Sequence, residues 1–280
     1  QDVEIVYTLD WKKFFSGRKT KVPNEMKKYS KDIEIRENIN DSKGNIVIIP
    51  ETFTFYSRKI KSANVFIYWL SVNNYFFNYE KYKVKKYSIL KFLHPHFDSP
   101  LTFNQILNSN FFHLAQSEYA ENFIKANFGK KPFLIYDFID KIPEFDEGFF
   151  NLIKRKKIIL YNPIKGLSTT KKLIKALGNE YKFVPLINLS YSKLIELLKY
   201  SAIYIDFGEH PGRDRIPREA ILCGCCIITG YKGSASFKDV PLSRKFKIFE
   251  DENLEKNFRA ILKKLFNKGE CRDLYQNAYE

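Results

Sequence analysis

The hydrophobic pattern divides the second half of the chain into short apolar runs that alternate with longer amphipathic stretches. The apolar runs predict strands at residues 158–161, 181–184, 203–205, 225–229 and 247–249. The amphipathic stretches predict helices at residues 168–177, 191–200, 217–223 and 254–266. This alternation is typical of a doubly wound parallel sheet, whose ligand-binding loops gather at the carboxyl ends of the strands.

The first half of the chain shows a less regular version of the same pattern. Strands are predicted at residues 3–7, 45–49, 65–68, 88–92, 112–115 and 132–136. A helix is predicted over residues 118–128, with Ser117 as its N-cap and Gly129 at its end. Residues 140–148 are acidic, contain Pro143 and Gly148 and lack periodicity, which is typical of a linker between domains.

Together these patterns predict an α/β fold in which two Rossmann-like domains face a cleft. The N-terminal domain is expected to cover residues 1–139 and the C-terminal domain residues 157–280. Residues 140–156 are expected to form the linker that joins them.

The chain carries a formal net charge of +15, which raises nucleic acids and anionic membranes as partners. Lysine supplies 37 of the 47 basic residues, and the charge is spread over both halves. This distribution argues against a nucleic-acid partner. It favours weak attraction to an anionic membrane surface.

The sequence contains no run of about 18 uncharged apolar residues, so no membrane-spanning segment is expected. Its first residues carry acids where a signal peptide would carry lysines. The four cysteines are expected to be buried thiols in a reducing compartment. They are Cys223, Cys225, Cys226 and Cys271. We therefore expect a cytoplasmic protein, peripheral on the inner face of the membrane.

A basic loop follows the strand predicted at residues 203–205. It places three of the chain's ten arginines, Arg213, Arg215 and Arg218, within six positions. Guanidinium groups bind phosphate oxygens in pairs, so the loop predicts a site for a phosphorylated ligand. Pro217 and Glu219 are expected in the first turn of the next helix, where an acid favours the helix dipole. The alternative is a solvated charge cluster with acidic partners within the loop.

Two further loops follow predicted strands of the same half. In Asn162-Pro-Ile-Lys-Gly166, Lys165 offers a point charge to a diphosphate and Gly166 allows close backbone approach. In Gly233-Ser-Ala235, small residues would let a substrate lie against the backbone. Each loop alone is also compatible with a simple surface turn. The chain lacks both Gly-x-Gly-x-x-Gly and a P-loop, which argues against a classical dehydrogenase and a P-loop nucleotidase.

The order of these motifs resembles the donor-binding domain of GT-B glycosyltransferases. The resemblance implies a nucleotide-diphosphate sugar as donor, with Glu219 on the ribose and with Lys165 and Arg215 offsetting the diphosphate charge. The donor-binding residues that it implies are Asn162, Lys165, Gly166, Arg213, Arg215, Arg218, Glu219, Gly233, Ser234 and Ala235. Retaining members often place a second glutamate where this chain has Pro211, with Glu209 nearby. The choice between retention and inversion therefore stays open.

The first half supplies loops that look like the acceptor side of such an enzyme. The expected acceptor-side residues are Glu51, Trp69, Ser71 and Asn74. An inverting reaction needs a general base, for which the sequence offers Glu51, His94, His96 and Asp98. Glu51 is favoured because it follows a strand at the expected cleft. The expected catalytic residues are thus Glu51, Arg215 and Lys165, and no metal ligand is assigned because Asp-x-Asp does not occur.

The sequence therefore predicts a glycosyltransferase of the hexosyltransferase type without a cofactor. It would move a sugar from a nucleotide donor to a glycan or lipid-linked glycan, in surface polysaccharide biosynthesis. The alternatives are a nucleotide-sugar epimerase and a non-catalytic module that binds sugar or phosphate. A third alternative is a basic protein that binds nucleic acid.

Overall fold

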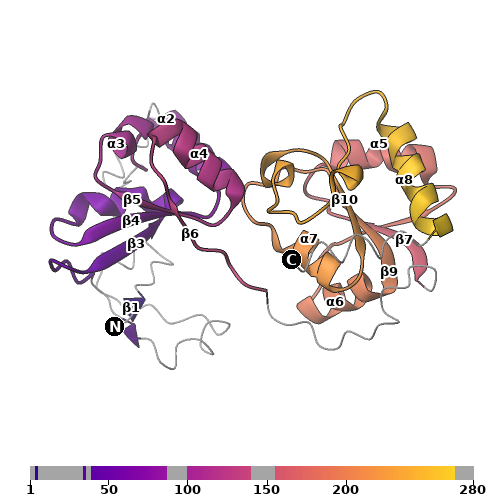
Figure 1. Ribbon diagram of the computed structural model, residues 1–280, viewed down its shortest axis with the longest axis horizontal. Coiled ribbons are helices and arrows are strands. Elements are labelled where there is room, and N and C mark those ends of the chain that lie inside the picture. Colours follow the sequence, from indigo (N-terminus) through magenta and orange to yellow (C-terminus); the bar gives the residue numbers. More distant parts are fainter. Residues whose placement is uncertain (1–3, 6–33, 36–38, 87–99, 140–154, 269–280) are drawn as a thin grey trace.

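The computed structural model describes residues 4–5, 34–35, 39–86, 100–139 and 155–268. They form two lobes, each built on a parallel four-stranded sheet (Figure 1). The first sheet has the order β3-β4-β5-β6, with β3 Ile46–Pro50, β4 Asn64–Trp69, β5 Phe112–Ala115 and β6 Phe133–Leu134. The second has the order β10-β9-β7-β8, with β7 Lys156–Tyr161, β8 Lys182–Pro185, β9 Ser201–Asp206 and β10 Cys226–Thr229.

Three helices cover one face of the first sheet (Figure 1). They are α2 Val72–Lys86, α3 Phe103–Leu107 and α4 Glu118–Phe128, and the short η2 Glu51–Lys59 follows β3. The alternate residues Ile67 and Trp69 of β4 point into the core beneath the helices, while Val65 packs with Tyr56 of η2. A separate parallel pair, β1 Glu4–Ile5 with β2 Glu34–Ile35, contains part of the predicted strand 3–7.

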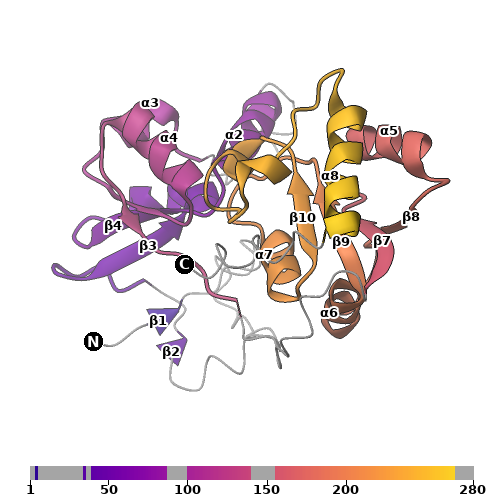
Figure 2. The ribbon, with the colours of Figure 1, turned by 45° about the vertical axis from the view of Figure 1, so that its right-hand side comes forward.

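The second sheet has helices on both faces, as a doubly wound sheet requires. The helices α5 Leu167–Leu177 and α8 Leu254–Lys268 lie on one face, and α6 Tyr191–Tyr200 and α7 Arg215–Leu222 lie on the other (Figures 1 and 2). All six residues of the central strand β9 are buried, which explains its continuous apolar run. Cys223, Cys225 and Cys226 are buried free thiols in this core, as predicted.

Two helices match their predicted bounds, and local signals mark both ends of α4 and the start of α6. The hydroxyl of Ser117 accepts a hydrogen bond from the Ala120 amide, and Gly129 ends α4 in the left-handed conformation. The hydroxyl of Ser190 caps α6 in the same way. The strand predicted at residues 247–249 is wrong in extent, since only Lys247 forms a bridge, to Thr229.

Several predictions concern residues outside the described ranges. They include the strand at 88–92, most of the linker at 140–156 and Cys271, so the domain boundaries stay a prediction. Within the described ranges, no helix is both long and apolar enough to cross a membrane.

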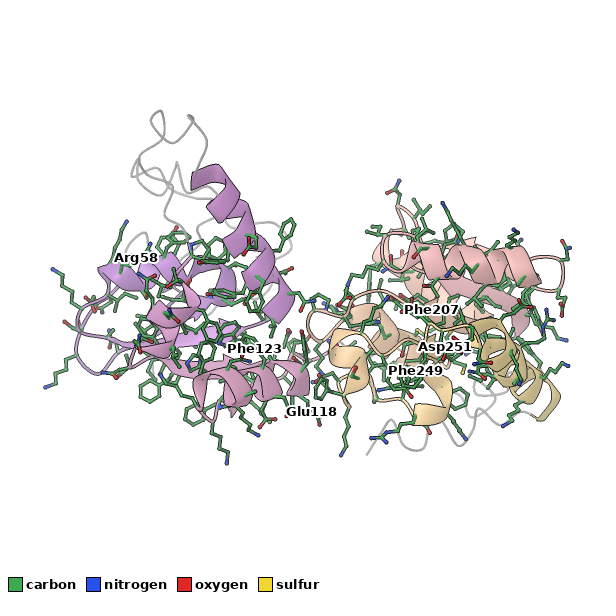
Figure 3. The ribbon with its side chains drawn as sticks, turned by 90° about the horizontal axis from the view of Figure 1, so that it is seen from above. Arg58, Glu118, Phe123, Phe207, Phe249 and Asp251 are labelled. Carbon is green, nitrogen blue, oxygen red and sulfur yellow. The ribbon has the colours of Figure 1, made fainter. Side chains whose placement is uncertain are left out.

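The two lobes contact one another at several points (Figure 3, where Glu118 marks the junction). The carboxylate of Asp239 accepts hydrogen bonds from the amides of Glu118 and Tyr119, in the first turn of α4, at 2.7 and 3.0 Å. The β9–α7 loop lies against Leu70, which follows β4. The approach is so close that a side chain at Gly212 would overlap the Leu70 carbonyl oxygen. The carboxyl edges of the two sheets therefore face each other.

Arg155 joins three segments at the amino end of the second sheet. Its guanidinium donates hydrogen bonds to the carbonyl oxygens of Leu198, Ser201 and Cys223 at 3.0, 3.1 and 2.7 Å. Leu198 and Cys223 lie in the last turn of α6 and at the C-cap of α7, where carbonyls lack helical partners. A cation is also favoured there by the helix dipoles.

Replacing Arg155 with methionine should lower the free energy of unfolding by about 3 kcal/mol, because buried carbonyls lose charged donors while most of the side-chain volume is kept. Urea unfolding followed by circular dichroism measures this. Arg244→Met, at an exposed arginine, should change stability by less than about 0.5 kcal/mol. Equal effects of the two substitutions would contradict a clamping role for Arg155.

Candidate functional site

Three loops lie side by side at the carboxyl ends of the adjacent strands β7, β9 and β10. We call them the β7 loop (residues 162–166), the β9 loop (residues 207–214) and the β10 loop (residues 230–236). Hydrogen bonds and close backbone packing connect the β9 loop with each of the other two. The structure thus brings together the three segments that the sequence singled out.

Glycines allow the β7 and β9 loops to pack backbone against backbone. Gly166 has φ +62°, and a side chain there would overlap the backbone of Phe207 and Gly208. A side chain at Gly208 would in turn overlap the β-carbon of Lys165. Only glycine fits such approaches. Gly166 is thus required for the contact between the two loops, and close approach of a diphosphate to it stays a prediction.

The β10 loop is held against the β9 loop in the same manner. Gly233 has φ +58° and lies against the carbonyl of His210, which accepts a hydrogen bond from the Ser234 amide at 2.8 Å. The hydroxyl of Ser234 donates to the carbonyl oxygen of Gly212 at 2.6 Å. Ser234 and Ala235 are buried. These small residues therefore accommodate the β9 loop, and the expectation that a substrate also lies against them stays a prediction.

The β7 loop places Lys165 at the solvent-exposed side of the cluster, which we call its open side. The side-chain oxygen of Asn162 accepts hydrogen bonds from the amides of Ile164 and Lys165, at 2.9 and 3.3 Å, and so shapes the turn. The Nζ atom of Lys165 donates to Oδ2 of Asp214 at 2.8 Å. Lys165 is one-third exposed, so its ammonium group remains accessible to a ligand.

Helix α7 begins at Arg215, two residues earlier than predicted. Asp214 is its N-cap residue by position, but makes no capping hydrogen bond because its carboxylate binds Lys165. Glu219 consequently lies in the second turn of α7, which corrects its predicted place in the first. Its carboxylate is buried and pairs with Arg215 at 3.2 Å. The Arg215 side chain is 53% exposed and faces solvent.

The two other loop arginines contact the segment that follows β6 in the first lobe. Arg218 is buried and donates to the carboxylate of Asp137 at 2.7 Å and to the Arg213 carbonyl at 2.9 Å. The guanidinium of Arg213 lies over the ring of Tyr136, 4.4 Å from its centre. Because both groups serve the contact between the lobes, the geometry does not favour the predicted phosphate contacts at Arg213 and Arg218.

Glu51 lies buried at the end of β3, beside the contact between the lobes. Its Oε2 accepts a hydrogen bond from the amide of Leu70 at 3.0 Å. Burial raises the pKa of Glu51 to about 7, although backbone amides that include those of Leu70 and Ser71 oppose the shift. A carboxyl group with this pKa has the acidity of a general base that works near neutral pH.

The other predicted acceptor-side residues have different environments. Trp69 is wholly buried and donates a hydrogen bond to Nδ1 of His113 at 3.0 Å, which corrects its assignment to a substrate-facing loop. The inward alternation of β4 is the reason. Ser71 is also buried, and its hydroxyl accepts from the amide of Asn74 at the start of α2. Asn74 itself is exposed. The candidate bases His94, His96 and Asp98 lie outside the described residues.

Sequence reasoning missed one wholly buried polar group of the cluster, His210. It is fully buried, with Nε2 3.8 Å from Oδ1 of Asp206 and Nδ1 3.1 Å from Oδ2 of Asp214. Burial lowers the pKa of His210, but the two carboxylates outweigh burial and raise the pKa above its ordinary value. The same proximity, together with Lys165, keeps the pKa of Asp214 low despite burial. The four-residue spacing Asp206, His210, Asp214 was the available signal.

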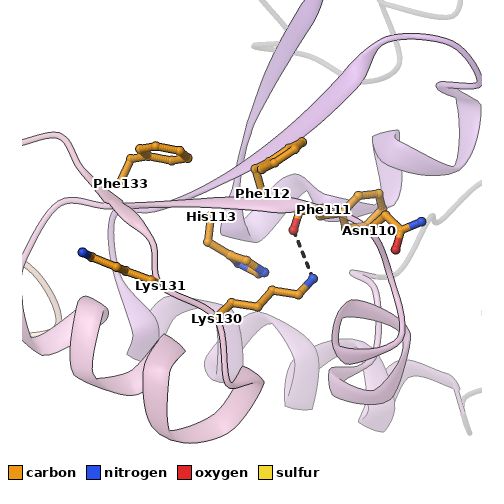
Figure 4. A pocket seen from close by; sticks show the side chains of 7 residues that line it. All are labelled: Asn110, Phe111, Phe112, His113, Lys130, Lys131 and Phe133. Atoms are coloured by element: carbon orange, nitrogen blue, oxygen red, sulfur yellow. Dashed lines mark hydrogen bonds between the residues drawn. The ribbon is translucent and has the colours of Figure 1, made fainter.

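A cavity of about 390 Å³ lies elsewhere, at the amino edge of the first sheet (Figure 4). Lys130 crosses it and donates to the carbonyl oxygens of Ser109 and Phe111 at 2.7 and 3.1 Å. Burial and the nearby Lys130 charge lower the pKa of His113 to about 4, which keeps its ring neutral. Lys130 is thus held by backbone carbonyls, and the cavity lies at the opposite edge of the sheet from Glu51.

The sequence matches none of the known family models and none of the curated proteins. Solved structures do match. Sucrose-phosphate synthase from Thermosynechococcus elongatus gives a TM-score of 0.55 at 12% identity, over 83% of this chain and 67% of that one. HepE from Anabaena, solved with UDP-glucose, gives a TM-score of 0.53 at 13% identity, over 82% of this chain and 72% of that one. TarM from S. aureus, solved with UDP, gives a TM-score of 0.54 at 14% identity, over 91% of this chain and 53% of that one.

The chain has the GT-B fold. It spans from about half to about 70% of the length of these three structures. The identities are low, so the likeness concerns the architecture. In this GT-B chain, the β7, β9 and β10 loops lie on the edge of the second sheet that faces the first lobe.

Proposed function

We propose that this protein is a glycosyltransferase that takes a sugar from a nucleotide-diphosphate donor at the cluster of the β7, β9 and β10 loops. The observation that carries the proposal is the convergence of these loops, with Lys165 and Arg215 at their open side, on a fold shared with enzymes solved with UDP or UDP-glucose. Ligands of open α/β sheets bind at this edge. The acceptor would approach from the first lobe, where Glu51 lies.

The cations of the cluster are suited to a leaving diphosphate. Glycosyl transfer passes through an oxocarbenium-like state while negative charge grows on the phosphate. Lys165 pairs with Asp214, Arg215 with Glu219, and Lys232 with Glu250 at 2.8, 3.2 and 2.7 Å. The pairs of Lys165 and Lys232 are partly exposed, and such pairs contribute only about 0–1 kcal/mol, so their carboxylates compete weakly with a diphosphate. The carboxylate of Glu219 is buried, so its pair with Arg215 is harder to displace. This chemistry would need no metal ion.

We further propose a glycan or lipid-linked glycan as acceptor and a cytoplasmic site of action on an anionic membrane surface. The excess of lysine supports the membrane part of this proposal. The buried carboxyl of Glu51 supports an inverting reaction, because its raised pKa suits removal of the acceptor proton.

Isothermal calorimetry with UDP, GDP and their sugars tests the proposal. Binding by at least one nucleotide sugar, followed by transfer to an acceptor, is the expected result. Absence of binding to every member of the panel would contradict the proposal. Donor consumption without a transfer product would indicate an epimerase or hydrolase, and binding without turnover would indicate a non-catalytic module. Tight, steeply salt-dependent binding of DNA or RNA would indicate a nucleic-acid binder.

Replacing Lys165 with alanine should weaken nucleotide-sugar binding by about 1.5–3 kcal/mol, the worth of a charged hydrogen bond. The same calorimetric titration measures the loss. Lys175→Ala serves as the control, because Lys175 is an exposed residue in the last turn of α5. Unchanged affinity in Lys165→Ala would remove Lys165 from the diphosphate site.

A further inference from the structure

Four titratable groups form a continuous row from the interior of the second lobe to its open side. Oδ1 of Asp206 lies 3.8 Å from Nε2 of His210, and Nδ1 of His210 lies 3.1 Å from Oδ2 of Asp214. The same Asp214 oxygen accepts the hydrogen bond from Lys165 at 2.8 Å. The side chains of Asp206 and His210 are buried, and exposure rises to 23% for Asp214 and 33% for Lys165.

The charges of this row balance only if the His210 ring is protonated. Asp206 is held in place by hydrogen bonds from the Tyr204 hydroxyl and the Gly208 amide, at 2.8 and 3.0 Å. Among the described residues, neither ring nitrogen of His210 has an aligned hydrogen-bond partner. Each ring nitrogen nevertheless faces a carboxylate oxygen, an arrangement that favours the protonated ring. A neutral ring would leave the buried carboxylate of Asp206 and the part-buried carboxylate of Asp214 with Lys165 as their only cation in the row, which is unfavourable.

We propose that His210 is a positioning residue whose imidazolium neutralises Asp206 and Asp214, so that Lys165 can leave Asp214 and bind the donor diphosphate. The inference rests on the function proposed above. In the ligand-free site, Asp214 competes with the diphosphate for Lys165. Once Lys165 turns to a phosphate oxygen, Asp214 keeps the imidazolium as its partner and is not left as an unpaired charge.

Donor binding is then linked to the proton on His210. Asp206 and Asp214 favour the imidazolium, while burial and the ammonium of Lys165 oppose it. Movement of Lys165 to the diphosphate removes that opposition, so donor and proton favour each other's binding. Affinity for the donor should therefore be highest below the raised pKa of His210. It should fall as the pH rises through that pKa.

The same three residues lie close enough together to be considered as metal ligands. Their other contacts favour a proton over a divalent cation. Both oxygens of Asp206 already accept hydrogen bonds, and the ammonium of Lys165 lies on the Asp214 oxygen that a metal would need. His210 also directs a different nitrogen toward each carboxylate.

Calorimetric titration with UDP-glucose, from about pH 6 to about pH 9, brackets an ordinary histidine pKa of about 6.5 and tests the inference. The diphosphate of this probe stays ionised across the range. Wild-type affinity should fall by about tenfold or more as pH rises, within the usual range of coupling between two sites. His210→Gln should bind about tenfold more weakly at low pH and show no pH dependence.

Asp214→Asn distinguishes a charge effect from a structural one. It should bind at least as well as wild type, because the competing carboxylate is gone. The double variant His210→Gln/Asp214→Asn should regain most of the affinity lost in His210→Gln. A merely structural role of His210 predicts no such rescue, so a double variant no better than His210→Gln would overturn the inference.

The outcomes also separate this inference from the proposed function. If wild type binds UDP-glucose and His210→Gln shows the same pH profile, only the role of His210 is lost. If wild type binds neither UDP-glucose nor any other nucleotide sugar, the proposed function is lost and the role of His210 falls with it. The backbone contacts of residue 210 with Gly233 and Ser234 do not depend on its side chain, so each variant is expected to fold. Urea unfolding of each variant verifies this.

Discussion

Gly166→Ala is expected to lower the free energy of unfolding by about 3 kcal/mol or more and to abolish donor binding. A left-handed conformation costs an alanine about 1–2 kcal/mol, and overpacking adds about 1–3 kcal/mol. The added methyl group would overlap the backbone of Phe207 and Gly208, which is less able to move than a side chain. Relief of the overlap would separate the β7 loop from the β9 loop and displace Lys165.

Gly129→Ala provides a matched control. Gly129 has the same φ of +62°, yet a side chain there would have nothing within 4 Å. It should therefore lose only about 1 kcal/mol of stability and keep donor binding. Urea unfolding and calorimetry of both variants give the comparison. Equal losses would show that backbone conformation alone, and not the close approach of the two loops, requires glycine at position 166.

Glu51→Gln is expected to reduce kcat by roughly 10²–10⁴-fold if Glu51 removes the acceptor proton. The glutamine keeps the shape of the side chain and an oxygen for the Leu70 amide. In wild type, the rate should rise with pH through about 7, the raised pKa of Glu51, because only the carboxylate accepts a proton. Transfer rates across a pH series measure both effects. An active variant with the wild-type pH profile would exclude Glu51 as the base.

The same substitution has the opposite effect on stability. The pKa of Glu51 is about 7 in the folded chain and 4.5 ordinarily, so its contribution to stability is fully present below pH 4.5. That contribution is lost as the pH rises through about 7. Since glutamine does not ionise, Glu51→Gln should be more stable than wild type above that pH, by about 3 kcal/mol. Loss of activity with a gain in stability would mark a functional carboxylate.

Local signals in the sequence account for most of the fold. The caps Ser117, Gly129 and Ser190 act on neighbouring residues, so the bounds of α4 and α6 could be predicted. The convergence of the β7, β9 and β10 loops could also be predicted, because alternating strands and helices place successive loops at one edge of a parallel sheet.

Contacts between distant residues account for what could not be predicted. Arg218 has the composition of a phosphate ligand, but its partner Asp137 lies 81 positions away and belongs to the first lobe. The sequence predicts Trp69 in a loop, but β4 extends to include it, and the alternation of the strand turns its side chain into the core. The spacing of Asp206, His210 and Asp214 could have drawn attention to His210, but its burial depends on the packing of Gly233 and Ser234 against it.

The carboxylate of Asp239 ties the start of α4 to the opposite lobe. If the lobes move apart to admit or release a molecule, two amides at the helix terminus lose their acceptor and must be hydrated, as must the carboxylate. Separation of the lobes and fraying of this helix are then a single event. Any separation of the lobes would therefore be opposed by a capping interaction that belongs to neither lobe alone.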